Sequence, residues 1–435
     1  MHETNGVLMK KRTIKSVVAA ISISLVSNLL AVASNSIEAA PAQKGGQSKK
    51  VVSVKSTASE VVGATEKFGL DLFQQLSAEK SGENCFISPA SVAIALNFAM
   101  SGSSGATRAA MAKGLRLANP QADTASAFNE LLKALESKDS QVEMNIANAI
   151  FVNEKYKLNS SFEQNAKVDF QSEIRNENFS DARTISKVNG WVSDKTKKHI
   201  PSIISKLPAE AFAVLLNAIY FKGSWTTPFS ASDTKDGDFH LDSGGTKKVS
   251  FMNRSGKFSY FEEKDFQAVR LPYGSERYEA FVFLPAPSVK LSEFQRRMNS
   301  QNFDKYVGQF DSWNHSHLTV PRFHIDYSKT LNQSLQSLGF ENIFSDGADF
   351  SLMHTPPPGL KVSEVIHKTT LDVDEKGTVA TAATSVMMMP TMARMESPRS
   401  FKMVVDRPFL FAIRDSQTGL LLFFGSVYTP EKKAP

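Results

Sequence analysis

Few side chains in this sequence are spaced for catalysis. The segment Asp242-Ser-Gly-Gly suggests a serine nucleophile, but it lacks the glycine that should precede it and runs into the polar stretch Thr246-Lys-Lys, which indicates a turn. The sequence contains no Gly-x-Ser-x-Gly, no His-Glu-x-x-His and no Cys-x-x-Cys motif. We therefore expect that the protein is not an enzyme and that it uses neither a metal nor another cofactor.

The sequence has one cysteine, Cys85, in the apolar stretch Asn84-Cys-Phe-Ile. One cysteine cannot form an internal disulfide, so the fold must depend on its core alone. A reactive thiol needs an electropositive and partly exposed setting, which this stretch does not suggest. We expect Cys85 to be a small buried hydrophobic residue.

The N-terminal segment has the pattern of an export signal. Basic residues from Lys10 to Lys15 precede an apolar run that ends in small residues, which predicts a signal peptide over residues 1–40 and favours Met9 as the start. An uncleaved membrane anchor is the alternative, but the serines and Asn28 in the run disfavour a permanent span. Residues 41–58 are rich in Lys, Ser, Gln and Gly and predict a flexible leader. The folded domain is expected over residues 59–431, in a secreted or extracellular protein, or in the periplasm or at the cell surface of a bacterium.

Composition excludes some classes of function. The 435 residues are 41% hydrophobic and 22% charged, which is typical of a globular protein with a large core. The net charge of +6 is small for this length, and the basic residues form no stripe of the kind that binds nucleic acid. We therefore expect no nucleic-acid partner, and no membrane partner after signal cleavage.

Apolar periodicity predicts helices in the first half of the domain and strands mostly in the second, which is typical of an α+β fold rather than of repeated βαβ units. Helices are expected at Ser59–Leu76, Ser88–Met100, Ala106–Leu115, Ala125–Leu135, Ser160–Phe170, Thr184–Lys197 and Lys329–Gly339. Strands are expected at Asn145–Val152, Phe212–Phe221, Phe258–Phe261, Ala268–Leu271, Tyr278–Leu284, His317–Pro321, Val365–Val373, Phe401–Val405 and Leu420–Tyr428.

One internal segment does not fit a compact domain. Gly377–Ser400 begins with small, uncharged residues and continues with a Met-rich stretch that contains two prolines. An unstructured loop of about twenty residues between two strands is uncommon and is usually functional. Its first half could enter a sheet, because it has no charge to desolvate and no proline before Pro390.

Several motifs then occur in a family-like order and spacing. From about Ser59 to Pro430 the chain resembles a serpin. The motifs that carry the resemblance are Asn84-Cys-Phe-Ile-Ser-Pro-Ala-Ser-Val-Ala, Ser101-Gly-Ser-Ser-Gly-Ala-Thr, Leu216-Asn-Ala-Ile-Tyr-Phe-Lys-Gly-Ser-Trp225, Leu271-Pro-Tyr-Gly, Asp374-Glu-Lys-Gly-Thr378 and Asp406-Arg-Pro-Phe-Leu-Phe followed by Phe424-Gly.

The resemblance implies about nine helices packed on three β-sheets, with an exposed reactive-centre loop at about residues 375–400. In serpins of the inhibitory type a protease cuts this loop, and the N-terminal part inserts into a five-stranded central sheet and traps the acyl-enzyme. The insertion requires a hinge of small residues. The residues that match this hinge are Glu375, Gly377, Thr378, Ala380, Ala382 and Ala383.

The resemblance also implies two polar groups along the path of insertion. Ser88, Ser91, Asn217 and His367 match the positions of the shutter under the sheet, where a buried network can hold two strands and then exchange partners. Trp225, Arg322 and Glu375 match the breach at the top of the sheet. We expect an ion pair between Arg322 and Glu375.

Family spacing places the reactive bond between Thr391 and Met392. The stretch from Thr391 to Pro408 is longer than in familiar members, so the bond between Arg394 and Met395 and the neighbouring methionines remain alternatives. Thr391 or a methionine would suit an elastase-, chymotrypsin- or subtilisin-like serine protease, Arg394 would suit a trypsin-like one, and a cysteine protease is a further option. The inhibitor is expected to be a monomer. The alternative is a non-inhibitory serpin that acts as a binding, carrier or chaperone protein.

Overall fold

The structure is a computed structural model that describes residues 57–119, 123–135, 139–354, 360–378 and 399–432. The expected signal peptide, most of the leader, the hinge residues Ala380, Ala382 and Ala383, and the candidate reactive-bond residues Thr391, Met392, Arg394 and Met395 lie outside these ranges. No helix of the described residues combines the length and the apolar character that crossing a membrane requires.

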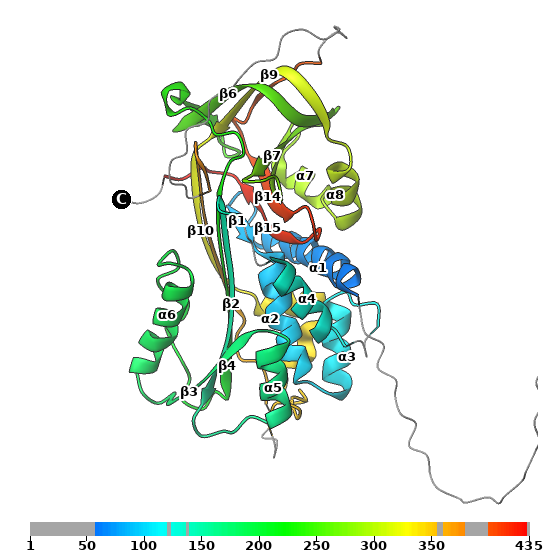
Figure 1. Cartoon of the computed structure of the whole chain (residues 1–435), viewed down its shortest axis with the longest axis vertical. Coiled ribbons are helices and arrows are strands. Elements are labelled where there is room, and N and C mark those ends of the chain that lie inside the picture. The colour runs from blue at the N-terminus through cyan, green and yellow to red at the C-terminus, as the bar shows by residue number, and fades with distance from the viewer. Residues whose placement is uncertain (1–56, 120–122, 136–138, 355–359, 379–398, 433–435) are drawn as a thin grey trace, which may run out of the picture. The chain divides into compact units, whose positions relative to one another are not determined.

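The described residues form nine α-helices, which makes the fold α+β as predicted (Figure 1). The helices are α1 (Ala58–Glu79), α2 (Pro89–Ser101), α3 (Gly105–Gly114), α4 (Ala125–Leu135), α5 (Ser160–Val168), α6 (Arg183–Lys195), α7 (Leu291–Arg297), α8 (Ser300–Val307) and α9 (Asn332–Leu335). Short η segments lie at Ala231–Asp233, Gln336–Phe340 and Glu341–Phe344.

A six-stranded sheet has the order β10-β11-β12-β4-β2-β3. Its strands are β2 (Val142–Asn153), β3 (Ser172–Glu177), β4 (Ala213–Ser224), β10 (Phe323–Thr330), β11 (Ile366–Asp374) and β12 (Gly377–Thr378). Helix α6 covers one face of this sheet and α2 lies against the other (Figure 1). Without the two-residue β12 the sheet has the five strands that the resemblance implies.

The remaining strands form one nine-stranded sheet with the order β1-β15-β14-β8-β7-β6-β9-β13, and β5 pairs with β6. These strands are β1 (Cys85–Ile87), β5 (Lys235–His240), β6 (Thr246–Glu263), β7 (Phe266–Tyr273), β8 (Tyr278–Pro285), β9 (Asp311–Pro321), β13 (Lys402–Val404), β14 (Phe409–Asp415) and β15 (Leu421–Val427).

The expected count of three sheets is corrected to two hydrogen-bonded sheets in the described residues. Strand β6 connects strands that would otherwise belong to two different sheets. Its first part pairs with β5 and β9, and its last part pairs with β7. The register shifts between Gly256 and Phe258, where Gly256 has a φ of 139°. A bulge bends a strand without ending its pairing, so the ladder continues through the bend.

Local chemistry explains two boundaries that the periodicity misplaced. Helix α1 begins at Ala58 because Thr57 and Glu60 form a capping box. The expected helix at Lys329–Gly339 is wrong at its start, because residues up to Thr330 pair with β11. It is also interrupted near its end, where Gly339 has a φ of 101°.

Cys85 is buried and free, as predicted. Burial raises the pKa of its thiol to about 12, so the thiolate is disfavoured. Ser243 lies in an exposed turn before β6, and Gly244 has a φ of 89° there. Neither group has the setting of a catalytic nucleophile.

Candidate functional site

The hinge begins inside the six-stranded sheet. Gly377 pairs with Asp374 of β11 and Ser224 of β4, and Thr378 pairs with Val373 and Gly223. Strand β12 is the link between β11 and β4 in the strand order. The hinge residues Gly377 and Thr378 therefore already occupy the place where the rest of the segment would insert.

Gly377 is required by this geometry. Its φ is 146°, and a Cβ there would lie 2.0 Å from the carbonyl oxygen of Gly223. Thr378 is fully buried, and its Oγ1 lies 2.8 Å from the hydroxyl of Tyr273. The close approach to β4 restricts residue 377 to glycine, and a buried hydrogen bond to Tyr273 holds Thr378.

The predicted breach residues come together at the turn between β11 and β12. Arg322 Nε donates to Glu375 Oε1 at 2.6 Å, and a second guanidinium nitrogen also contacts this oxygen. The Glu375 side chain is 8% exposed and the Arg322 side chain is 44% exposed, so the pair lies at the boundary between core and solvent. Trp225 Nε1 donates to the carbonyl oxygen of Asp374 at 3.0 Å, and the Trp225 amide donates to that of Lys376 at 2.8 Å.

The Glu375 carboxylate is held ionised by its partners. Burial by itself would raise the pKa of Glu375, but the hydrogen bonds from Arg322 and Thr234 outweigh burial and hold this pKa below its ordinary value. The Thr234 hydroxyl donates to Glu375 Oε1. The carboxylate thus ties the start of the hinge to the link between β9 and β10 through Arg322, and to the segment before β5 through Thr234.

Two residues of this region were not singled out from the sequence. Tyr273 stacks on Trp225 with ring centroids 4.3 Å apart and also holds Thr378. It stands in the motif Leu271-Pro-Tyr-Gly, which marked the position without indicating its role. Thr234 carried no sequence signal, because its contact with Glu375 spans 141 residues of chain.

The predicted shutter residues lie further from β12, on the face of the six-stranded sheet against which α2 packs. The backbone N–H of Ser88 donates to His367 Nε2 at 3.0 Å, and the hydroxyl of Ser88 accepts from the amide of Ser91 at 3.2 Å. Ser88 is the N-cap of α2, so the helix and β11 are joined through one residue. Asn217 lies in β4, but its side chain is outside the described part of the molecule.

Burial lowers the pKa of His367 to about 4. The imidazole is therefore neutral at pH 7, and Nε2 acts as the acceptor for the Ser88 N–H. A neutral histidine can accept from one neighbour and donate to another, which is the property that a shutter exchanging partners would need.

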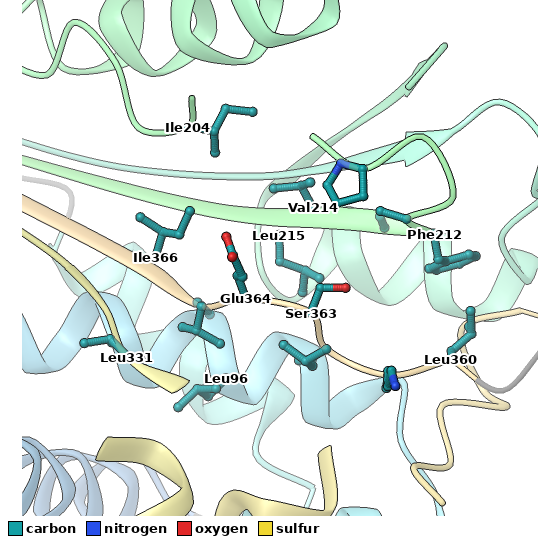
Figure 2. Close-up of a pocket in the computed structure, with 18 of the residues that line it drawn as sticks. Leu96, Ile204, Phe212, Val214, Leu215, Leu331, Leu360, Ser363, Glu364 and Ile366 are labelled. Carbon is teal, nitrogen blue, oxygen red and sulfur yellow. The ribbon is translucent and has the colours of Figure 1, made fainter. Parts of the chain in front are cut away.

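A cavity of about 260 Å³ lies at the lower end, between β4 and the segment 360–367 (Figure 2). Leu96 of α2 lies on one side of it and Ile204 on the other. On the side of Ile204, Lys206 Nζ and Glu364 Oε1 are 2.8 Å apart, and both residues line the cavity. The sheet is thus closed by β12 at its upper end, while its lower end holds a cavity whose lining is mostly apolar.

Comparisons with known proteins agree with this fold. The family model described as Serpin (serine protease inhibitor) matches residues 63–430. The chain belongs to the serpin family.

Relatives and solved structures extend over most of the chain. It is 32% identical to an alpha-1-antiproteinase of Rattus norvegicus, over 84% of this chain and 88% of the relative. It is 33% identical to Iripin-1 of Ixodes ricinus, over 84% of this chain and 93% of the relative. Human thyroxine-binding globulin in complex with thyroxine is similar with a TM-score of 0.79 and 25% identity, over 87% of this chain and 100% of the other. The thermophilic serpin tengpin in its native state is similar with a TM-score of 0.76 and 28% identity, over 90% of this chain and 97% of the other.

Proposed function

We propose that this chain is a secreted suicide inhibitor of serine endopeptidases. The target cuts the segment that follows β12, and the freed N-terminal part inserts between β11 and β4 while the protease remains attached as an acyl-enzyme. Insertion adds a full strand to the sheet and releases the strain of a fold that was held short of its most stable state.

One observation carries this proposal. Strands β11 and β4 are joined through the two residues of β12, and below them an apolar cavity separates β4 from the chain that leads into β11. The following residues carry no charge before Arg394, so they can enter the gap without an ionic desolvation penalty. A relative that is named an antiproteinase, at 32% identity, supports the same function.

The proposed reactive bond joins Thr391 and Met392, and the bond between Arg394 and Met395 is the alternative. The first choice implies an elastase-, chymotrypsin- or subtilisin-like target, and the second implies a trypsin-like one. Export through the N-terminal signal and a monomeric state belong to the same proposal.

A second candidate function is that of a ligand carrier. It is favoured by the similarity to thyroxine-binding globulin solved with thyroxine, together with the cavity of about 260 Å³. A carrier would not need an uncharged segment able to enter the sheet, so we place it second.

The test is to mix the protein with elastase, chymotrypsin, subtilisin and trypsin and to run a denaturing gel. An inhibitor leaves a covalent band near the summed masses of the two proteins, and mass spectrometry of the released peptide identifies the reactive bond. Cleaved product without a covalent band, for all four proteases, would contradict inhibition by trapping and favour the carrier.

A further inference from the structure

Two places in the described part of the chain flank residues 379–398, which carry the proposed reactive bond. On the N-terminal side is the turn at Glu375, whose carbonyl oxygen accepts from the amide of Phe229 at 2.8 Å. On the C-terminal side is Phe401, which is buried and stacks on Tyr260 with ring centroids 3.7 Å apart. We call these two places the N-terminal and the C-terminal attachment.

One side chain, that of Arg254 in β6, lies between the two attachments. Its guanidinium carbon is 4.9 Å from the ring centroid of Phe229 and 4.5 Å from that of Phe258. Phe258 in turn makes an edge contact with Phe401, with ring centroids 5.7 Å apart. A continuous chain of contacts between described residues therefore joins the two attachments through Arg254.

A bend in β6 makes this bridge possible. Arg254 and Phe258 are four residues apart, so in a straight strand their Cα atoms would be about 13 Å from each other. The register of β6 against β9 shifts between Gly256 and Phe258, and Gly256 has a φ of 139°, which favours glycine. The bend lets the long side chain of Arg254 lie over the ring of Phe258.

The chemistry of the guanidinium suits a place between two rings. It is planar and stacks on aromatic faces, which attract its charge. Burial lowers the pKa of Arg254 to about 10, which still leaves the group protonated at pH 7. In the described part of the chain no carboxylate forms an ion pair with Arg254, and its polar partner is the carbonyl oxygen of Thr227, to which it donates. Its role is therefore that of a bridge rather than of a partner in a salt bridge.

We propose that Arg254 is a positioning residue, which couples the two attachments and thereby determines how the reactive bond is presented to the target protease. The inference rests on the proposed function and adds a residue that acts before the bond is cut. In the intact chain the bond is connected to both attachments, so their coupling affects its geometry. Once the bond is cut, each part is connected to one attachment alone. Arg254 should therefore affect the rate of attack and not the steps that follow.

The test measures two quantities for the full chain with the protease that cuts nearest to residue 391. One is the second-order rate constant for consumption of the intact protein, and the other is the ratio of covalent complex to cleaved product. Arg254→Ala should lower the rate constant by roughly threefold or more and leave the ratio unchanged, since small misplacements slow attack. Arg297→Ala is the matched control and should alter neither quantity, because Arg297 lies 5.4 Å from the ring of Phe294 within α7.

A second substitution separates the bridge from the charge. Lysine in Arg254→Lys keeps the positive charge, but an ammonium cannot stack on two rings and donate to Thr227 at the same time. We expect Arg254→Lys to lose as much rate as Arg254→Ala, with the fold of each variant verified by its unfolding midpoint. Full recovery of the rate in Arg254→Lys would show that charge alone attracts the protease, and it would overturn the proposal.

A measurement without protease keeps this inference separate from the proposed function. Phe229→Leu perturbs the N-terminal attachment and Phe401→Leu the C-terminal one, and the unfolding midpoint is measured for each variant and for both together. Their effects should deviate from additivity by roughly 1 °C or more in the unmodified chain, and should add in the Arg254→Ala background.

Two results would overturn the inference: additive effects of these substitutions in the unmodified chain, or a lower ratio of complex to product at an unchanged rate in Arg254→Ala. A complete lack of covalent complex from the unmodified chain would contradict the proposed function instead. The deviation from additivity would in that case still show that Arg254 couples the two attachments.

Discussion

The upper and lower ends of the gap between β4 and β11 are built in opposite ways. At the upper end two residues of β12 complete the sheet, and aromatic rings, an ion pair and backbone hydrogen bonds hold them. At the lower end an apolar cavity lies beside unmatched lengths of β4 and of the chain before β11. The difference teaches that only the upper end of the sheet between β4 and β11 is completed by β12, which would give the proposed insertion a direction.

The largest expected effect comes from a charge in the middle of the path. Ala382→Arg should remain cleavable but form covalent complexes at less than about a tenth of the original yield, because a buried unpaired guanidinium costs several kcal/mol. The measurement is the ratio of covalent complex to cleaved product on a denaturing gel. Ala382→Ser is the control and should keep most of the complex. A normal yield from Ala382→Arg would mean that the segment does not enter the sheet at this position.

The next largest effect is expected from a substitution at Gly377, the first residue of β12. Gly377→Ala should lower the free energy of unfolding of the intact chain by about 2 kcal/mol, since its Cβ would meet the carbonyl of Gly223 at 2.0 Å. Gly63→Ala is the matched control, because Gly63 lies on α1 with no atom within 4 Å of a Cβ. That change should stabilise the chain by roughly 0.5–1 kcal/mol. Denaturant-induced unfolding measures the change in free energy for both variants. Similar changes would show that the close approach of Gly377 to Gly223 does not hold β12 in the sheet.

The ion pair at the breach should contribute less. Arg322→Ala leaves the buried carboxylate of Glu375 with fewer donors and should lower the free energy of unfolding by about 1–2 kcal/mol. Arg399→Ala is the control, because Arg399 forms an exposed ion pair in which its guanidinium nitrogen lies 3.6 Å from the Asp311 carboxylate. This change should alter the free energy of unfolding by less than about 0.5 kcal/mol. A loss for Arg322→Ala no larger than that for Arg399→Ala would contradict the role given to the pair.

Near pH 7 the smallest expected effect is that of the shutter histidine, because its pH dependence begins only below about pH 6.5. The pKa of His367 in the fold is about 4, below the ordinary value of 6.5, so the unfolded chain binds more protons between these values. The histidine therefore stabilises the fold fully above pH 6.5, and this contribution declines as the pH falls toward 4, by at most about 1.4 kcal/mol per pH unit. His367→Gln should flatten the unfolding midpoint against pH over this window, and an unchanged slope would exclude His367 as its source.

Much of the fold and the location of the site followed from the sequence. Periodicity placed six of the early helices because their apolar faces are regular. The family resemblance marked Arg322, Glu375, Ser88 and His367, which the structure brings together in pairs. The sequence did not predict that Thr378 is already buried, because that burial depends on Tyr273 of a distant strand. Short strands such as β1 and β12 carry too few residues for a periodic signal.

The cavity could not be predicted either, because it is formed by α2, β4 and the chain before β11 together.

The most direct test of the account is the heat stability of the chain before and after a single cut near residue 391. If the gap between β4 and β11 is filled by the freed segment, the nicked form should unfold at a temperature far above that of the intact form. An equal or lower unfolding temperature for the nicked form would contradict the account.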